Sequence, residues 1–156
     1  MQIPSEKQKI TKAQGATKQV EAAIEAIVKG NFAVAITLAG AAEGMLEGDG
    51  KEMFQVMLKA PGIEKTDQAK WIATLNGERD WLKHVTKEDP RKILEISNLD
   101  AGFMIARAAS KLDTWTPIIE EFKIWFFESD CRHARATNLA RDLFLCFFPF
   151  CVARFW

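Results

Sequence analysis

The chain has 156 residues, of which 48% are hydrophobic and 27% are charged. This length and composition are typical of one globular domain that buries its own core, and they exclude a chain that is mainly disordered. The 21 basic and 21 acidic residues cancel, so no global field attracts the chain to nucleic acid or to an anionic membrane. Any contact with RNA must therefore be local.

The distribution of cysteine and of apolar residues indicates a cytoplasmic protein. All three cysteines fall within residues 131–156 without CxxC spacing, and the polar segment 1–19 lacks the apolar stretch of a secretory signal. We therefore expect free thiols in a reducing compartment. The apolar run 143–153 is interrupted by Pro149 and is too short to cross a bilayer, so no membrane span is expected.

The beginning of the chain predicts a flexible leader followed by a helix. Residues 1–16 are rich in lysine, glutamine and serine and contain Pro4 and Gly15, which favours a flexible leader. From residue 17 onward, apolar residues recur at helical spacing until Gly30, which is placed as a C-cap glycine.

Two further helices are predicted over residues 32–46 and 51–58. The first contains the small residues 39–42, which allow another helix to approach closely, and tight packing is the simplest role for them. Glu43 follows these small residues and is interpreted as a surface or capping group. A proline followed by a glycine then ends the second of the two helices.

The middle of the chain predicts a short helix and then a separate polar segment. The helix over residues 69–75 is expected to stop at Asn76 and Gly77, directly before the segment 79–84. Residues 86–90 follow as a polar turn, because proline disfavours a helix at the residue before it.

The last two predicted helices begin at Asp100, a natural N-cap, and at Thr116, which precedes Pro117 at the first helical position. Five to six helices with almost no strand signal predict an all-α helical bundle. We expect this helical domain to cover residues 17–127. Residues 128–156 form a basic and then apolar C-terminal extension, for which a buried helix, a partner surface and an atypical terminus all stay open.

The segment 79–84 holds the residues best suited to chemistry, Arg79 and His84, with Asp80 and Lys83 between them. A neutral imidazole can remove a proton from a ribose hydroxyl, and an arginine can hold the phosphate that this hydroxyl attacks. Asp80 would orient either group, and Lys83 would add a phosphate contact. On a helix the pair lies about 140° apart and about 7.5 Å along the axis. Arg79 and His84 can therefore contact the same ligand only because the arginine side chain is long, or because a second copy of the helix faces the first.

Interpretations of these polar residues that involve no catalysis also stay open. The segment 79–84 is also typical of a solvated helix face with a histidine near its C-terminus. Cys131 and His133 are spaced as candidate metal ligands, but no second pair follows at zinc spacing, so no metal is expected. Their neighbours Arg132 and Arg135 suit a local RNA contact or a solvated helix turn. No cofactor is expected, because the chain has no glycine-rich phosphate loop.

The spacing of Arg79 and His84 resembles the motif of the HEPN superfamily, an arginine usually followed by a polar residue and, after four to six residues, by a histidine. The surroundings resemble a branch of bacterial HEPN-like proteins, over about residues 17–127. The matching segments are TLAGAAE at 37–43, WLKHVTKEDP at 81–90 and FKIWF at 122–126.

This resemblance implies a helical bundle that pairs as a homodimer, with the two arginine–histidine segments facing one another across a cleft. Active members of the superfamily are metal-independent ribonucleases, often in toxin–antitoxin or phage-defence systems, and other members only bind nucleotides or RNA. By this resemblance Arg79 and His84 are the catalytic pair. Asp80 departs from the asparagine frequent at its position, and a carboxylate there repels a phosphate unless Lys83 or Arg79 neutralises it.

Three functions from different classes follow from the sequence. The first is a metal-independent endoribonuclease that uses Arg79 and His84 across a homodimer cleft. The second is a catalytically silent module of the same fold that binds a nucleotide or RNA or only builds the dimer. The third is an interaction protein whose apolar C-terminus docks a partner, and a toxin role would add an antitoxin-like protein.

Overall fold

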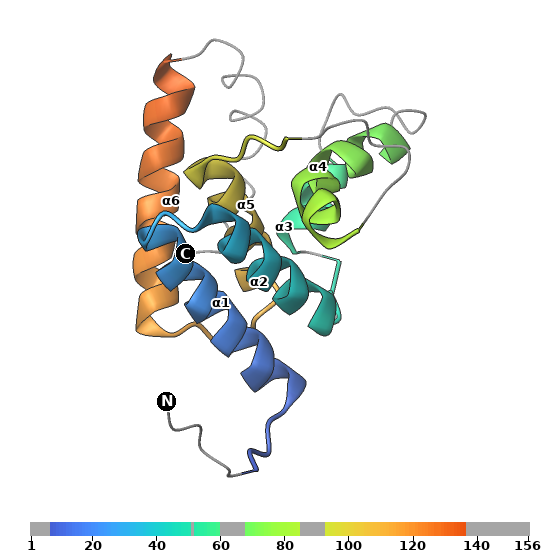
Figure 1. The fold of residues 1–156 in the computed structure, drawn as a ribbon, viewed down its shortest axis with the longest axis vertical. Coiled ribbons are helices and arrows are strands. Elements are labelled where there is room, and N and C mark those ends of the chain that lie inside the picture. The colour runs from blue at the N-terminus through green and yellow to red at the C-terminus, as the bar shows by residue number, and fades with distance from the viewer. Residues whose placement is uncertain (1–6, 51, 60–67, 85–92, 137–156) are drawn as a thin grey trace.

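The structure is a computed structural model that describes residues 7–50, 52–59, 68–84 and 93–136, with the side chains of 128–136 left out. All regular elements within these ranges are helices, which confirms the predicted all-α class (Figure 1). The elements are α1 Lys12–Val28, α2 Phe32–Met45, α3 Met53–Leu58, α4 Gln68–Lys83, α5 Asn98–Ala109 and α6 Pro117–Ala136.

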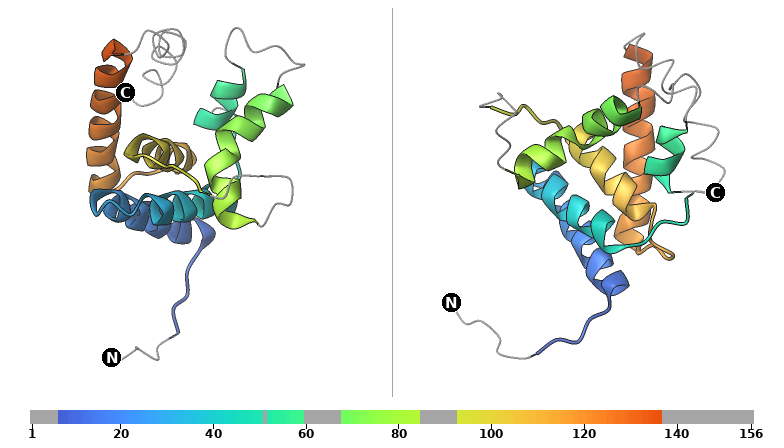
Figure 2. Two further views of the ribbon diagram at one scale, coloured as in Figure 1. Left: turned by 45° about the horizontal axis from the view of Figure 1, so that its top comes forward. Right: turned by 90° about the vertical axis from the view of Figure 1, so that its right-hand side faces the viewer.

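The helices form two layers. Helices α1 and α2 pack side by side, and α5 packs on both of them (Figure 2). In the left view of Figure 2, α6 and α4 stand at opposite ends of the α1–α2 layer, with α5 between them. The core lies where these helices meet, and α4 therefore contacts it from one side.

Helix α1 begins earlier than the sequence pattern predicted. Thr11 and Gln14 form a capping box, in which the Thr11 hydroxyl accepts from the Gln14 amide at 3.1 Å and the Gln14 side chain accepts from the Thr11 amide at 3.0 Å. Ala16 is fully buried. The expected boundary of the leader at residue 16 is thus corrected, because Lys12 and the residues after it belong to the helix.

The turn between α1 and α2 confirms the role assigned to Gly30. Its φ of 75° is in the left-handed region that favours glycine. The amide of Gly30 donates to the Ile27 carbonyl at 3.0 Å, and the amide of Asn31 donates to the Ala26 carbonyl at 2.9 Å. This is the hydrogen-bond pattern of a Schellman motif, which reverses the chain so that α2 can pack against α1.

Small residues bring the helices of the core close together. Seven alanines on α1, α2 and α5 are fully buried, and Ile36 and Ile105 fill the space between them with no exposed surface. Burying each of these isoleucine side chains contributes about 1.5–3 kcal/mol. The tight-packing role predicted for the small residues of α2 is therefore confirmed. The seven alanines are Ala16, Ala23, Ala35, Ala39, Ala42, Ala101 and Ala108.

Helix α4 is one continuous helix, which corrects the predicted interruption at Asn76 and Gly77. Both residues lie inside Gln68–Lys83, and Asn76 is buried. The segment with Arg79 is therefore the second half of a longer helix. Glycine in a helix interior costs about 1 kcal/mol relative to alanine, and tertiary contacts of this helix offset that cost.

The starts of the last two helices differ in detail from the prediction. Helix α5 is capped by Ser97, and Asp100 occupies the third helical position, where its carboxylate accepts from the Ser97 amide at 2.8 Å. Helix α6 begins at Pro117, as predicted, and continues to Ala136. The expected domain boundary at residue 127 therefore falls inside a helix.

Several predicted features lie outside the described residues. They are the polar turn at 86–90, the side chains around Cys131 and His133, and the apolar part of the C-terminal extension. Among the helices that are described, none has both the length and the apolar character needed to cross a bilayer.

Candidate functional site on helix α4

The side chain of Arg79 crosses the face of α2 at Gly40. A Cβ atom built on Gly40 would lie 2.9 Å from both Cγ and Cδ of Arg79, closer than such atoms approach in proteins. The missing side chain of Gly40 therefore leaves the space through which Arg79 reaches across α2.

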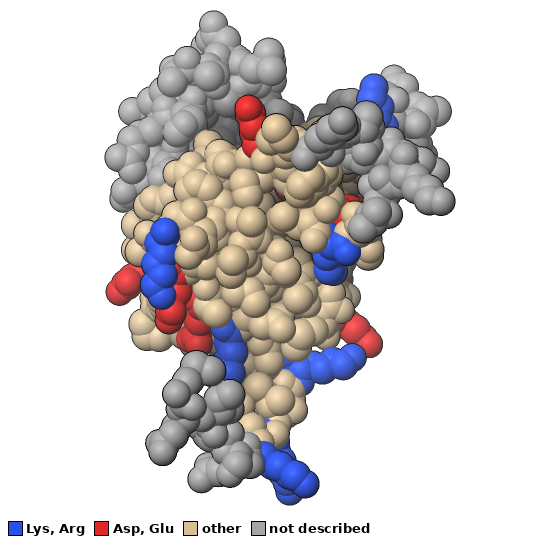
Figure 3. All heavy atoms as spheres, in the orientation of Figure 1, with Lys and Arg blue, Asp and Glu red and all other residues tan. Residues whose placement is uncertain are grey.

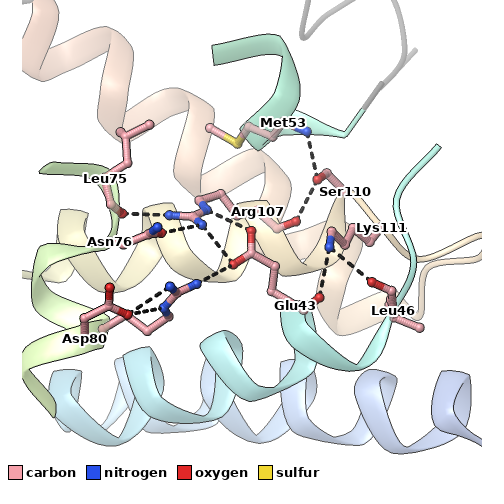
Figure 4. Close-up of polar contacts among 10 residues, drawn as sticks. Glu43, Leu46, Met53, Leu75, Asn76, Asp80, Arg107, Ser110 and Lys111 are labelled. Atoms are coloured by element: carbon pink, nitrogen blue, oxygen red, sulfur yellow. Dashed lines mark hydrogen bonds and ion pairs between the residues drawn. The ribbon is translucent and has the colours of Figure 1, made fainter. Parts of the chain in front are cut away.

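The guanidinium of Arg79 is paired with two carboxylates. Its Nε and Nη2 each lie 2.9 Å from Oδ1 of Asp80, and its Nη1 lies 3.4 Å from Oε2 of Glu43 (Figure 4). The Arg79 side chain is 22% exposed and that of Asp80 is 46% exposed. All three guanidinium nitrogens thus already contact an acid in one copy of the chain.

Arg107 of α5 is the centre of this polar cluster and is only 1% exposed. Its Nε donates to Oε1 of Glu43 at 3.0 Å and its Nη2 donates to Oε2 at 2.9 Å, a bidentate ion pair. Its Nη1 donates to the carbonyl of Leu75 at 2.7 Å, and Nη2 also reaches Oδ1 of Asn76 at 2.9 Å. Arg107 therefore joins α5 to both α2 and α4 (Figure 4).

The positive and negative charges of the polar cluster balance one another. Burial lowers the pKa of the Arg107 guanidinium, and the carboxylate of Glu43 opposes this shift. The face of the Phe54 ring, 4.3 Å from Arg107 Cζ, adds a cation–π contact. The charges of Glu43 and Asp80 balance those of Arg79 and Arg107, which leaves no excess positive charge for an anion.

Ser110 and Lys111, which follow α5, connect the end of α2 and the start of α3 to the polar cluster. Lys111 donates from Nζ to the carbonyls of Glu43 and Leu46, at 3.0 and 3.1 Å, and so satisfies acceptors at the C-terminus of α2. Ser110 accepts from the amide of Met53 at 3.0 Å. The cluster is thus continuous with the backbone connections around it.

His84 and Lys83 lie in a different environment from Arg79. Both are exposed, and His84 follows directly after the last residue of α4, with its amide donating to the Asp80 carbonyl at 2.9 Å. Within the described part of the chain, neither side chain has a recorded hydrogen bond or ion pair. The side chain of Arg79 crosses α2, whereas that of His84 is exposed, and among the described residues no hydrogen bond joins the two.

Three residues of the cluster were missed or misassigned from the sequence. The interpretation of Glu43 as a surface or capping group is wrong, because it is 5% exposed and binds two arginines. Arg107 and Asn76 were not predicted as polar contacts. A signal for the pair was present, because Glu43 is the one charged residue of α2 and Arg107 lies within an apolar stretch of α5. Such residues are rarely buried unless they are paired.

The described surface has no feature that by itself identifies a metal or nucleic-acid site. Within the described ranges, no group of three histidine, cysteine, aspartate or glutamate side chains could hold a metal ion. On the face drawn in Figure 3, the described charges are scattered and of both signs. In comparisons with protein-family models, curated proteins and solved structures, no match to the chain was found.

Proposed function

We propose that this chain is a catalytically silent, HEPN-like helical module that binds the phosphate group of a nucleotide or an RNA at the exposed end of α4. In this proposal Lys83 and His84 make the phosphate contacts, and Arg79 holds α4 in place. The observation that carries it is the pairing of all three Arg79 guanidinium nitrogens with Glu43 and Asp80.

The pairing of Arg79 argues against a catalytic role in the single chain. Cleavage by a base and an arginine requires both groups at the same phosphate. A phosphate that approaches Arg79 meets the carboxylates of Glu43 and Asp80, which repel it. Arg79 is therefore better suited to holding helices together than to binding the substrate.

Lys83 and His84 are better suited to a phosphate contact. They are consecutive and exposed, and their side chains have no recorded partner within the described residues. Lysine offers three donors and imidazole offers at least one. Two such contacts give weak, salt-dependent binding: for single-stranded RNA, each phosphate that is neutralised contributes about −0.7 to the slope of the logarithm of the binding constant against the logarithm of the salt concentration.

Titration of the full chain at low salt tests this proposal. Labelled single-stranded RNA is followed by fluorescence anisotropy, and ATP is followed separately by calorimetry, so that the two sources of phosphate are distinguished. Lys83→Ala and His84→Ala should each weaken binding severalfold. Lys70→Ala, an exposed lysine at the other end of α4, is the matched control and should bind as the wild type does. Wild-type protein that binds neither ligand would contradict the proposal.

The second candidate is a metal-independent endoribonuclease formed by two copies of the chain. It is favoured by the exposed imidazole of His84, which has no recorded partner within the described residues and so is accessible as a base. Arg79 of a second copy would then have to face it. A cleaving chain of this kind would fit a toxin restrained by an antitoxin-like protein partner.

RNA cleavage in the presence of a chelator separates the two candidates. Endoribonuclease activity predicts fragments with 2′,3′-cyclic phosphate ends that are lost in both His84→Ala and Arg79→Ala. The silent module predicts intact RNA with the folded wild type. Circular dichroism of each variant is needed, because Arg79 also supports the packing of α4.

A further inference from the structure

An open groove of about 680 Å³ lies at the end of the molecule opposite α4. It lies between the C-terminal part of α1, the start of α2, the first residue of α5 and the N-terminal half of α6. Small-molecule sites in proteins have volumes of about 300–1,000 Å³ and are mostly apolar with a few polar groups. The size of the groove therefore fits a small organic ligand. Its aliphatic lining comes from Ile24, Ile27, Val28 and Ile118.

The floor of the groove is fixed by the core, and the space above it is open. Ile24, Ile27 and Phe122 line the groove and are all buried. A Cβ atom built on Gly30, in the turn between α1 and α2, would meet no atom within 4 Å. An apolar ligand placed here covers apolar surface without any rearrangement of the core, which is favourable.

Trp125 places a fixed aromatic ring in the groove. Its ring centroid lies 5.6 Å from that of Phe122, and the two planes are tilted by 41°. Its Cζ3 atom would lie 3.3 Å from a Cβ atom built on Gly102, so the indole packs closely against α5. Trp125 is only half-buried, and part of the ring therefore stays accessible to a ligand.

Glu121 gives the groove a negative charge beside this ring. Among the described residues that line the groove, it is the single charged one, and no hydrogen bond or ion pair of its side chain is recorded. Glu121 precedes Trp125 by four positions on α6, so the two lie on one helix face with Cβ atoms about 5–6 Å apart. The nearest cation in the sequence of the α1 wall, Lys29, lies 3.6 Å from Glu25 of its own helix.

We propose that the groove binds a small organic cation with an apolar body, such as an alkyl ammonium ion. The ammonium group lies between the carboxylate of Glu121 and the face of Trp125, because both a carboxylate and an aromatic face attract a cation. The alkyl chain covers the apolar floor. The amide of Asn98, at the first position of α5, adds a polar contact at the edge of the groove. One acid in the lining matches one positive charge on the ligand and repels an anion.

This site is independent of the phosphate-binding proposal. The groove and α4 stand at opposite ends of the α1–α2 layer (Figure 2). The two ligands also have opposite charges, since a phosphate is an anion and the groove is proposed for a cation. Phosphate binding at α4 can therefore fail or succeed without changing what is expected at the groove.

Calorimetric titration of the full chain with matched probes tests the ligand class. The probes are n-octylamine, n-octanoate and n-butylamine, near neutral pH, at low salt and below the concentration at which they form micelles. Octylamine should bind at least about threefold more tightly than octanoate, because the two share a chain length and differ in charge. Butylamine should bind at least about tenfold more weakly than octylamine, because it buries fewer methylene groups. Absence of octylamine binding, or equal binding of octanoate, would overturn the proposal.

Charge changes on α6 test the role of Glu121. Glu121→Gln should weaken octylamine binding by about two- to fivefold, the range of an exposed ion pair, and Glu121→Lys should make octanoate the preferred probe. Glu120→Gln is the matched control, because Glu120 pairs with Lys123 at 2.8 Å and does not line the groove. It should bind octylamine as the wild type does. An unchanged affinity in Glu121→Gln, or an equal loss in Glu120→Gln, would contradict a specific contact with Glu121.

A substitution on the opposite wall tests whether the probe lies in the groove. Val28 lines the groove and is 82% exposed, so Val28→Lys places a cation at the site without disturbing the core. It should weaken octylamine binding severalfold and strengthen octanoate binding. The matched control is Val34→Lys, because Val34 is 51% exposed but does not line the groove, and both affinities should stay as in the wild type. Octylamine binding that Val28→Lys leaves unchanged would place the probe elsewhere and overturn the proposal.

Discussion

Glu43 binds the buried guanidinium of Arg107 with both carboxylate oxygens, at 3.0 and 2.9 Å, and so joins α2 to α5. The same carboxylate contacts Arg79 of α4, and Arg107 also donates to Leu75 of that helix. The carboxylate of Glu43 and the guanidinium of Arg107 therefore connect α2, α4 and α5. The position of α4, and of the exposed residues at its end, depends on this ion pair.

Replacement of Glu43 by leucine should destabilise the protein strongly. Arg107 is 1% exposed and would keep its charge without a carboxylate partner, which costs about 3–5 kcal/mol in the free energy of unfolding. Urea unfolding followed by circular dichroism measures the change. Glu25→Leu removes an exposed acid from α1 and should change stability by less than about 0.5 kcal/mol. A loss below about 1 kcal/mol for Glu43→Leu would contradict a buried, charged pair.

The two partners should be strongly coupled in a double-mutant cycle. Arg107→Met keeps most of the side-chain volume but leaves Glu43 without its main partner. The double variant Glu43→Leu with Arg107→Met should be more stable than the sum of the two single losses predicts, by about 0.5–3 kcal/mol, since neither charge then remains unpaired. Additive losses within about 0.5 kcal/mol would mean that the two side chains do not interact across the interface.

The effect of Gly40→Ala should depend on Arg79. Alanine favours a helix by about 1 kcal/mol over glycine, but its Cβ would be 2.9 Å from two methylene carbons of Arg79. We expect the substitution to be destabilising in the wild type, by about 1 kcal/mol or more, because the arginine must shift away from Glu43.

Removal of the arginine provides the control for that prediction. In the Arg79→Ala background the close contact is absent, so Gly40→Ala should stabilise the protein by up to about 1 kcal/mol. Thermal unfolding of the four proteins gives the sign of the effect in each background. An equal effect in both backgrounds would show that Arg79 does not occupy the space above Gly40.

The sequence pattern predicts those features of the fold that depend on local chemistry. Apolar periodicity and terminal signals correctly identify the all-α class, the Gly30 cap and the Pro117 start. The pattern predicts Asp100 as the N-cap of α5, where the structure has Ser97, because both residue types are good caps and only the geometry separates them. Local rules thus locate an element more reliably than its first residue.

The polar cluster could be predicted only in part, because it depends on contacts between distant segments. Glu43 and Arg107 are 64 positions apart, and nothing local to either one specifies the other. The sequence pattern draws attention to Arg79, but it does not indicate the partner Glu43 on α2. The continuity of α4 depends on the same long-range contacts, since Arg107 binds Leu75 and Asn76 where local propensity predicts a break.

Alanine substitutions at adjacent positions of α4 should therefore have opposite effects. Asn76→Ala removes an acceptor from the buried Arg107 and should cost about 1–3 kcal/mol, which exceeds the gain of well under 1 kcal/mol in helix propensity. Gly77→Ala adds a Cβ with no atom within 4 Å and should stabilise the protein by about 0.5–1 kcal/mol. Both are measured by urea unfolding. If Asn76→Ala were also stabilising, the continuity of α4 would come from local propensity, and the contact with Arg107 would contribute nothing measurable to it.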